Sequence, residues 1–381
     1  MTDVTLGTKA CLAVIGYTYV GYPLLVVAAA RVRERRRGRA VPVRRDPPTM
    51  TVLVPAYNEA GVIDGKIRDA LAQDYPPDKL DVVVVADGSD DGTARIARRR
   101  GVTVLWQPQR EGKSAAVNRG MAAATGDLVC LTDANCRLTP GSLRALADAF
   151  VDPAVAVVSG AKTVSGDGAK GAGEGLYWRV EARQKQAEST FGCTMGAPGE
   201  ICGIRHSAFR HIPPGIVTDD FYIACDALVR GLQVRYTSGA VAAEEVSPTL
   251  ADEFERRARI GAGTWQTTLG HLCLADPRRG WTAFAFVSHR LLRNVVVPPL
   301  LPLLGLVSAR NAMRGRDTRM ILEAQAVVYL AAAIGAISDS PVVAAPFQFV
   351  LMNLATLRGA ARFLTRRQPS AWRKVGRTHA R

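Results

Sequence analysis

The stretch "VVVVADGSDDGT" runs from Val82 to Thr93 and joins four successive valines directly to a cluster of acids and glycines. Consecutive valines are typical of a strand that is buried on both faces, as in parallel sheets. Asp87, Asp90 and Asp91 follow at the carboxyl end of that strand. Asp and Gly also suit turns and helix caps, so the stretch alone is compatible with a plain strand–turn–helix or with a strand end that binds a ligand.

The same pattern continues along residues 49–159, where short apolar runs alternate with amphipathic segments. Strands are predicted at 51–56, 81–86, 102–106, 127–132 and 155–159, and helices at 60–73, 92–100, 112–124 and 140–150. This alternation predicts an α/β fold with a mainly parallel sheet flanked by helices. Ligands of open α/β sheets bind beyond the carboxyl ends of the strands, where the acids of the opening stretch fall.

Three of the predicted strands deliver polar side chains to that edge. The first ends at Asn58 and Glu59, the second at Asp87, and the fourth at Asp133 and Asn135. Carboxylates gathered in one place repel one another unless a cation or a donor-rich ligand lies among them. Mg²⁺ and Mn²⁺ prefer oxygen ligands and often share them with substrate phosphates. The sequence therefore predicts a site for a divalent cation and a diphosphate that carries a ring with hydrogen-bond donors.

The chain has 381 residues, of which 48% are hydrophobic, and the apolar residues are unevenly distributed. Cys11 to Ala30 is an uncharged run of 20 residues, the length that a membrane-spanning helix needs. The run is too long for the apolar core of a cleaved signal peptide, and no A-x-A site precedes the basic residues that follow. We interpret it as a membrane anchor.

The net charge of +15 is concentrated in two segments. Residues 31–45 carry eight arginines and one glutamate, and residues 362–381 carry seven basic residues and no acid, so each segment contributes +7. A nucleic-acid-binding protein would spread basic residues over a folded face with stacking aromatics, so this class of partner is not indicated. Positive charge beside apolar segments is typical of the cytosolic side of a membrane, where it attracts anionic lipids.

These observations divide the chain into five parts. We predict a transmembrane anchor at 1–30, a basic linker at 31–48, a cytosolic catalytic domain at 49–280, interfacial and transmembrane helices at 281–365, and a basic cytosolic tail at 366–381. The seven cysteines form neither a C-x-x-C pair nor a Cys/His cluster, which indicates reduced thiols rather than zinc ligands or disulfides. A multi-pass protein of the cell membrane is expected.

The C-terminal apolar part contains three stretches, Val295–Ala309, Ile321–Ile337 and Pro341–Leu357. The first is short and is interrupted by Pro298, Pro299 and Pro302. Because prolines break helices and three crossings would place the basic tail outside, we predict that residues 281–309 lie along the cytosolic leaflet. The next two stretches would then cross out and back.

Four motifs carry a resemblance to a known family. "VPAYNE", "VVADGSDDGT", "GKSAAVNRG" and "LTDAN" resemble, in order and spacing over residues 49–135, the nucleotide-binding half of the inverting family-2 glycosyltransferases with their GT-A fold. "TDDF" at Thr218–Phe221 and "RRARIGAGTWQ" at Arg256–Gln266 are similar to the membrane-bound branch that contains cellulose, hyaluronan, chitin-oligosaccharide and poly-N-acetylglucosamine synthases. The resemblance implies transfer of a sugar from a nucleotide-sugar, here a UDP-sugar, to a lipid-linked or glycan acceptor.

The resemblance also implies roles for individual residues. It places at the nucleotide-sugar Pro55, Ala56, Tyr57, Glu59, Asp87, Lys113, Asn118 and Asp133. It places at a divalent cation, Mg²⁺ or Mn²⁺, Asp133 and Asn135, and at the leaving diphosphate Arg256, Arg257 and Arg259. Asp220 would be the general base that deprotonates the acceptor hydroxyl, and residues 196–210 would form the acceptor-side strand and helix start.

The chain departs from the family pattern in three places. Ala86 stands where a second acid often precedes Asp87, and Asn135 stands at the last position of the D-x-D motif. The Q-x-x-R-W motif of processive synthases is also incomplete, since Arg256 and Ile260 occupy its first and last positions, although Trp265 is nearby. The missing aromatic residue favours transfer of one or a few sugars.

Other interpretations of the sequence were weighed. "GKS" at Gly112–Ser114 suggests a phosphate-binding P-loop, but the first glycine of that motif would fall at Gln107. The glycine cluster at Gly166–Gly175 is interpreted as a flexible loop over the site rather than a dinucleotide site. A nucleotidyltransferase and a catalytically degenerate membrane scaffold remain as alternatives, and UDP binding would discriminate them from a glycosyltransferase.

Overall fold

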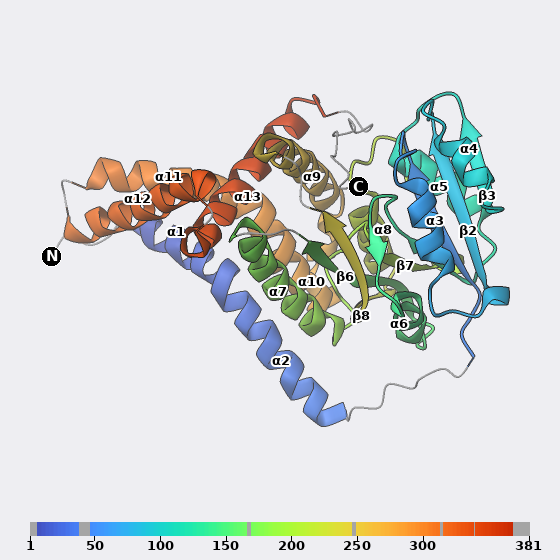
Figure 1. Ribbon diagram of the computed structural model, residues 1–381. Coiled ribbons are helices and arrows are strands. Elements are labelled where there is room, and N and C mark those ends of the chain that lie inside the picture. The colour runs from blue at the N-terminus through green and yellow to red at the C-terminus, as the bar shows by residue number, and fades with distance from the viewer. Residues whose placement is uncertain are drawn as a thin grey trace.

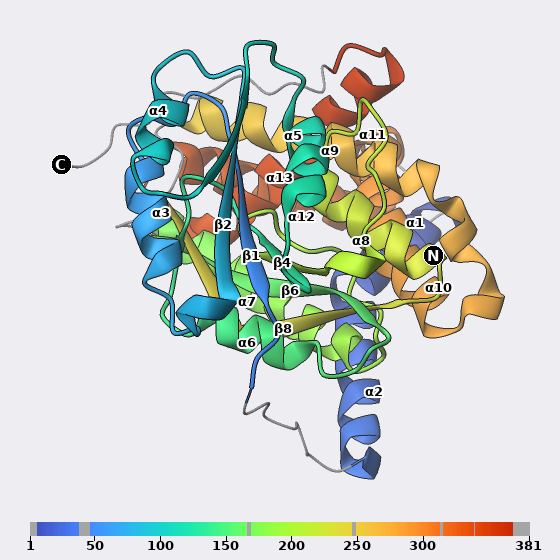
Figure 2. The ribbon, with the colours of Figure 1, turned by 90° about the vertical axis from the view of Figure 1, so that its right-hand side faces the viewer.

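The computed structural model describes residues 6–37, 46–165, 169–245, 249–312, 315–338 and 340–368. Its centre is a mixed sheet of eight strands in the order β3-β2-β1-β4-β7-β6-β8-β5 (Figures 1 and 2). The strands are β1 Met50–Ala56, β2 Leu80–Asp87, β3 Thr103–Gln107, β4 Leu128–Leu131, β5 Arg137–Leu138, β6 Val155–Ser165, β7 Cys202–Arg205 and β8 Gln233–Glu245. Strands β1 to β4 are mutually parallel, and β7 runs antiparallel between β4 and β6. The predicted α/β fold with a mainly parallel sheet is confirmed.

The four valines of β2 do not alternate with polar residues, because both faces of this strand are buried. Val82 and Val84 belong to one buried hydrophobic cluster, together with Ile63 and Ile67 of helix α3 (Ile63–Leu71). Val83 and Val85 belong to the other cluster, which includes residues of helix α5 (Lys113–Ala123). Both faces of the strand are therefore covered by helices, as parallel strands require.

The remaining elements of the domain cover the two faces and edges of this sheet. The helices are α4 Thr93–Arg98, α6 Ser142–Ala149, α7 Ala169–Ser189, α8 Asp219–Val229 and α9 Leu250–Gly270, with short 3₁₀ turns η2 Pro77–Lys79, η3 His206–Ala208, η4 Leu272–Ala275 and η5 Pro277–Arg279. The glycine cluster Gly166–Gly175, predicted as a flexible loop, lies only partly within the described residues. Residues 166–168 lie outside the described residues, but residues 169–175 form the first turns of α7, so the loop prediction is wrong there.

The N-terminal apolar run forms one continuous helix composed of α1 (Leu6–Gly16), a π segment η1 (Tyr17–Gly21) and α2 (Tyr22–Arg37). Its second half docks on the catalytic domain, because Tyr22, Val26 and Ala30 are buried in the same cluster as one face of the sheet. Residues 31–37 of the predicted linker continue this helix, which corrects that boundary. Residues 38–45 lie outside the described residues.

The apolar C-terminal part begins with a continuous helix, Trp281–Asn311, made of α10 (Trp281–Ala285), a π segment η6 (Phe286–Val296) and α11 (Val297–Asn311). The expectation that its prolines interrupt it is wrong. Pro298 lacks the N–H that would bond to the carbonyl of Asn294, one helical turn earlier. The indole Nε1–H of Trp265 donates to that carbonyl instead, at 2.8 Å, so a tertiary contact satisfies the freed group.

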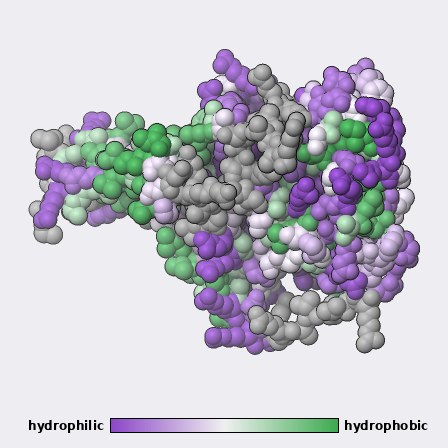
Figure 3. Space-filling model, in the orientation of Figure 1, coloured by the Kyte–Doolittle hydropathy of each residue, from purple (hydrophilic) through white to green (hydrophobic). Residues whose placement is uncertain are grey.

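Two further helices complete the chain, α12 (Arg316–Ile337) and α13 (Pro341–Leu364). Four helices are long and apolar enough to cross a membrane: Gly7–Arg36, Trp281–Asn311, Arg316–Ile337 and Pro341–Leu364. Hydrophobic residues gather over the part of the molecule that α11 and α12 form, away from the sheet (Figure 3). These four helices indicate a membrane protein.

The end of α13 is fixed to the catalytic domain through α9 (Figure 1). A side chain at Gly359 would approach the Ala258 carbonyl oxygen to 2.5 Å, so the two backbones touch where only glycine fits. Farther along, Arg362 pairs with Glu255 of α9 at 2.5 Å. The carboxyl end of α13 and the catalytic domain therefore lie on the same side of any membrane that the chain crosses.

Candidate active site

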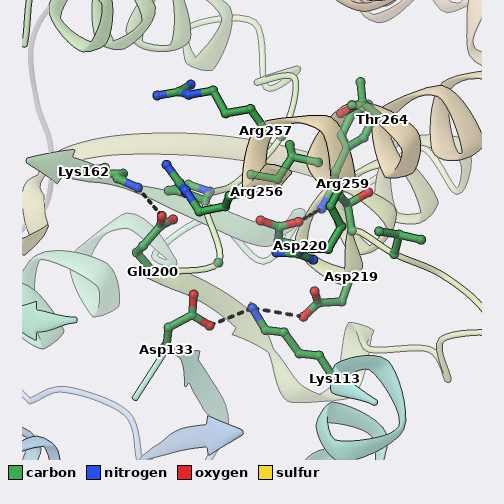
Figure 4. A pocket seen from close by; sticks show the side chains of 18 of the residues that line it. Lys113, Asp133, Lys162, Glu200, Asp219, Asp220, Arg256, Arg257, Arg259 and Thr264 are labelled. Atoms are coloured by element: carbon green, nitrogen blue, oxygen red, sulfur yellow. Dashed lines mark hydrogen bonds and ion pairs between the residues drawn. The ribbon is translucent and has the colours of Figure 1, made fainter. Parts of the chain in front are cut away.

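A cavity of about 1210 Å³ opens beyond the carboxyl ends of β1 and β4, and α7, α8, α9, η6 and α13 contribute to its walls (Figure 4). Ten of the thirteen site residues predicted from the sequence line it: Pro55, Tyr57, Glu59, Lys113, Asp133, Asn135, Asp220, Arg256, Arg257 and Arg259. Motifs that are up to 200 residues apart are thereby brought to one place. The other three, Ala56, Asp87 and Asn118, do not line it.

Lys113 is the cation around which the acids of this cavity are arranged. It is the first residue of α5, and its Nζ lies 2.7 Å from Asp133 Oδ1 and 3.8 Å from Asp219 Oδ2 (Figure 4). Burial opposes the charge on Lys113, but the carboxylates of Asp133, Asp219 and Asp220 outweigh burial and raise its pKa. Lys113 therefore stays charged and neutralises part of the acid cluster.

The two acids of the "TDDF" motif begin α8 and differ in their surroundings. Asp220 faces the cavity, and its Oδ1 accepts a hydrogen bond from the Phe221 amide at 2.7 Å. Burial, followed by repulsion from Asp219, raises the pKa of Asp220 to about 7. A carboxylate with a pKa near the working pH can accept a proton during reaction and release it afterwards, which is what a general base requires.

Three arginines of α9 reach the cavity but only one is left without a partner. Arg256 and Arg257 both pair with Glu253, and Arg256 also lies 3.9 Å from Glu244. No described residue forms an ion pair or hydrogen bond with the Arg259 guanidinium. Burial, together with the positive charge of Arg256, lowers the pKa of Arg259. An anion bound beside Arg259 would relieve both effects.

A second charged cluster, which the sequence did not reveal, also lines the cavity. Lys162 of β6 forms ion pairs with Glu200 and with Glu244, and the ring of Trp178 lies 5.4 Å from its Nζ. Although burial raises the pKa of Glu200, Lys162 lowers it to about 2, so the cluster is ionised. Glu200 lies within residues 196–210, the predicted acceptor-side segment, but nothing in the sequence marks Lys162.

Asp87, at the end of the opening stretch, has a different environment from the one expected. It is 1% exposed, and Arg119 and the amides of Glu111 and Gly112 donate to its carboxylate at 2.6, 3.2 and 2.7 Å. These contacts fix the turn that leads into α5. Arg110 of the same turn lies 3.6 Å from the ring centre of Tyr57, which lines the cavity, so Asp87 supports that wall from behind.

Ala56 and Asn118 also contribute to the fold rather than to the cavity lining. Ala56 is buried at the end of β1. The side chain of Asn118 donates to the Ile212 carbonyl and accepts from the Ile212 amide, both at 2.9 Å. It therefore ties α5 to the segment that follows η3.

The metal site was predicted from Asp133 and Asn135. Within the described ranges, no group of three His, Cys, Asp or Glu side chains is arranged to hold a metal ion. Asp133 offers one carboxylate, which contacts Lys113. The side-chain amide nitrogen of Asn135 donates to Glu244 at 3.2 Å, and its side-chain oxygen accepts from the Cys136 thiol at 4.0 Å. These oxygens fit a hard divalent cation only if phosphate oxygens complete its coordination.

Trp265 does not replace the missing aromatic residue of the processive motif. It is absent from the cavity lining, and its indole bonds to the Asn294 carbonyl, as described above. Ile260 lines the cavity at the motif's last position. All seven cysteines are free thiols, as the sequence predicted.

The model of the family "Glycosyl transferase family 2" matches residues 51–212. This range contains β1 to β7 and therefore the Lys113 and Asp133 part of the cavity. The chain carries a family 2 glycosyltransferase domain and is a transferase.

Curated relatives extend the similarity beyond this domain. An N-acetylglucosaminyltransferase of Rhizobium meliloti (strain 1021) is 25% identical over 306 residues, which cover 74% of this chain and 72% of the relative. An N-acetylglucosaminyltransferase of Rhizobium leguminosarum bv. viciae is 25% identical over 244 residues, covering 58% of this chain and 57% of that protein.

A solved structure shows that the similarity of fold includes the apolar helices. The mannosyltransferase PcManGT from Pyrobaculum calidifontis, in complex with GDP-Man and Mn²⁺, superposes with a TM-score of 0.74 at 24% identity. The superposition covers 94% of this chain and 99% of that protein. The GT-A fold is thereby established.

Proposed function

We propose that this protein is an inverting glycosyltransferase that moves a sugar from a UDP-sugar to a lipid-linked or glycan acceptor at the cytosolic face of the membrane. The observation that carries the proposal is Asp220. Its carboxylate, with a pKa of about 7, faces the cavity that also contains Lys113, Asp133 and the unpaired Arg259. A proton acceptor and anion-binding groups thus share one enclosed space.

In the proposed reaction, Asp220 accepts the proton of the acceptor hydroxyl as its oxygen attacks the anomeric carbon. The new bond forms on the face opposite the departing diphosphate, so the configuration inverts and no covalent enzyme intermediate is needed. The proton rests on Asp220, and the bonding electrons leave with the diphosphate. A positioned base contributes a factor of about 10²–10⁴ to such a step.

The leaving diphosphate is proposed to lie between Lys113 and Arg259. Both groups are partly buried cations that line the cavity, and a guanidinium can bind phosphate oxygens with two parallel hydrogen bonds. Arg256 and Arg257 keep their pairs with Glu253 and act by fixing this wall of the cavity. The nucleobase would stack beside Tyr57 and Pro55.

A divalent cation, Mg²⁺ or Mn²⁺, is proposed to bind with the donor. Asp133 and the carbonyl oxygen of Asn135 would hold it together with diphosphate oxygens, and Lys113 would shift from its present contact with Asp133. The cation would supply positive charge that stabilises the leaving group. A chain with so few carboxylate ligands should bind the metal weakly without nucleotide.

The choice of donor rests on the relatives. Those compared above are named N-acetylglucosaminyltransferases, whereas the superposable mannosyltransferase was solved with GDP-Man and Mn²⁺. We propose UDP-N-acetylglucosamine as the first donor to test and GDP-mannose as its main competitor. Because Ile260 replaces the aromatic residue of processive synthases, we propose the transfer of one or a few sugars.

The test uses the full chain purified in detergent with Mn²⁺ and a panel of UDP- and GDP-sugars. We expect release of UDP from one UDP-sugar, and a transferred sugar whose anomeric configuration is opposite to that of the donor by NMR. Retained configuration would contradict the mechanism, and preference for GDP-sugars would contradict the proposed donor. Failure to bind either nucleotide would leave a degenerate scaffold as the better explanation.

In the proposed topology, both ends of the C-terminal part lie on the cytosolic side of the membrane. Since Arg362 pairs with Glu255, the end of α13 lies with the catalytic domain, in support of two crossings by α12 and α13 with Ser338–Ser340 outside. Three crossings would separate Arg362 from Glu255. The helix Trp281–Asn311 would then lie along or dip into the cytosolic leaflet, although its length permits a crossing.

Labelling of single cysteines with a membrane-impermeant reagent in intact cells tests this topology, in a background without Cys11 and Cys273. A cysteine at Ser338 should react and one at the exposed Thr365 should not. The opposite result would establish three crossings.

A further inference from the structure

The π segment η6 presents two different faces to the catalytic domain. His289 and Arg293, four residues apart, face the glutamates of α7: His289 contacts Glu188 at 2.7 Å and Glu181 at 3.3 Å, and Arg293 contacts Glu181 at 2.8 Å. These contacts fix η6 against α7. The neighbouring pair, Arg290 and Asn294, has the same spacing and lines the cavity instead.

The cavity-facing pair carries buried donors that no described residue satisfies. Among the described residues, Arg290 Nε and Asn294 Nδ2 are buried side-chain nitrogens without a hydrogen-bond partner, although Arg290 Nη2 donates to the Met195 carbonyl oxygen. Lys185 of α7 joins them: it lines the same cavity and is 7% exposed, its carbonyl oxygen accepts from Thr194, and its Nζ forms no hydrogen bond or ion pair with a described residue. Because a buried donor without a partner is destabilising, these two nitrogens and the neighbouring Lys185 ammonium indicate a ligand that accepts hydrogen bonds.

The acids around these three donors are already engaged. Glu188 accepts from Tyr22 at 2.8 Å and from the Met195 amide at 3.0 Å, in addition to its contact with His289. Glu181 is occupied by His289 and Arg293, as described above, and Glu200 pairs with Lys162. Burial, despite the attraction of Glu181, lowers the pKa of Lys185. The missing partner is therefore an anion from outside the chain.

Arg290 lies near Asp220. The Arg290 guanidinium lies 4.8 Å from the ring centre of Phe221, the residue that follows Asp220, and a side chain at Gly196 would approach Arg290 to 2.7 Å. Three residues farther along, a side chain at Gly199 would lie 2.8 Å from Lys113 Nζ and 3.3 Å from Asp220. A three-residue span reaches at most ~10 Å, so the donors and the Lys113 group lie at opposite ends of this short segment.

We propose that Lys185, Arg290 and Asn294 form a binding site for the phosphate group of a lipid-linked acceptor whose attached sugar presents the attacking hydroxyl. This names the acceptor class for the proposed glycosyltransferase and rests on that function. A dianionic phosphate matches two cations and an amide donor. Two of the helices that are apolar enough to cross a membrane line the same cavity, through Arg290 and Asn294 on one and Met352 and Thr356 on the other. An apolar tail can leave the site along them.

The test measures acceptor binding without turnover. A prenyl monophosphate, the matching uncharged prenol and inorganic phosphate are titrated calorimetrically into the full chain in detergent micelles, and UDP with Mn²⁺ is titrated into the same preparation. We expect the prenyl monophosphate to bind at least tenfold more tightly than the prenol or inorganic phosphate. Lys185→Met should remove that advantage, and Asn294→Asp should weaken it at least fivefold by placing a negative charge beside the phosphate.

Arg183→Met is the matched control, because Arg183 lies two residues from Lys185 on α7 but is exposed. It should leave every affinity unchanged, and no variant should alter UDP binding by more than twofold. Equal affinity for the monophosphate and the prenol would overturn the proposal, and so would a full effect in the control. Inorganic phosphate that binds as tightly as the lipid would overturn the lipid source. If the unaltered chain does not bind UDP, the glycosyltransferase proposal is contradicted. The lipid titration is a separate measurement and tests the phosphate site independently of that result.

Discussion

The two ends of the cavity are built in different ways. At the donor end, Lys113 and Asp133 come from a helix start and a strand end within residues 51–212, the range of the family match. At the acceptor end, Lys185 and Arg290 come from α7 and η6, about 100 residues apart, and are placed by packing between helices. We propose that the strand-and-turn scaffold holds the donor, while helix packing decides which acceptor enters.

If this division is real, variants at one end should leave ligand binding at the other unchanged. The junction between the two ends is Asp220, which contacts neither group directly but faces the cavity between them. The largest effects are therefore expected there.

Asp220→Asn should lower kcat by about 10²–10⁴-fold, because it removes the proton acceptor while keeping the shape of the side chain. The affinity for UDP with Mn²⁺, measured by calorimetry, should stay within twofold. Asp133→Ala should do the reverse and weaken nucleotide binding at least tenfold. Equal loss of UDP affinity in both variants would show that the two acids do not have separate roles.

Asp87→Ala tests whether that acid acts on the fold or on the nucleobase. Removing it leaves the part-buried Arg119 without its partner, and breaking a buried ion pair costs about 3–5 kcal/mol. We expect a lower free energy of unfolding by at least about 2 kcal/mol in denaturant titration, since Arg119 is partly exposed. Arg119→Gln is the matched variant and should lose a similar amount.

Asp87→Ala and Arg119→Gln can also be compared by their preference for UDP over ADP. If Asp87 binds the base, Asp87→Ala should relax the preference for UDP over ADP and Arg119→Gln should not. An unchanged preference in both would restrict Asp87 to holding the turn at residues 110–112 beside Tyr57.

The donor end could be predicted from the sequence because its residues follow strands at fixed short intervals. The valines of β2 identify the strand, and the acids that follow identify the sheet edge. Even so, a position at that edge did not specify the orientation of the side chain, because Asp87 points toward Arg119 rather than into the cavity. Which way a side chain points depends on neighbours that are distant in sequence.

The acceptor end could not be predicted, because no local pattern distinguishes Lys185 or Lys162 from a solvated lysine. The helix Trp281–Asn311 shows the same limit. Proline chemistry alone predicts a break at Pro298, and only the tertiary contact from Trp265 explains why the helix continues.

Gly359→Ala tests the coupling between α13 and the catalytic domain. A methyl group there would lie 2.5 Å from the Ala258 carbonyl oxygen and from the Ala262 amide, so α13 must move away from α9, at a cost of about 1–3 kcal/mol. Because α13 lines the cavity through Met352 and Thr356, the acceptor KM should rise while UDP affinity stays constant.

Gly305→Ala is the control for this change, since a side chain there would meet only Gln325 at an ordinary 3.7 Å in another apolar helix. It should leave both the acceptor KM and the thermal midpoint unchanged. Weaker UDP binding in Gly359→Ala would show that the donor end depends on α13 as well, and the division into two ends would fail.

The smallest expected effect is the pH dependence of the unaltered protein. Burial and Asp219 raise the pKa of Asp220 to about 7, so the active carboxylate form is lost as the pH falls below that value. At saturating substrates, kcat should be constant above about pH 8 and should fall about tenfold per pH unit below pH 6, because only the ionised fraction can accept a proton. UDP affinity should depend less on pH than kcat does, because the pKa of Lys113 is raised and this residue keeps its charge. A kcat that is flat from pH 5 to 8 would mean that the reaction does not need Asp220 as a base, as expected if an acceptor phosphate, rather than a hydroxyl, were the attacking group.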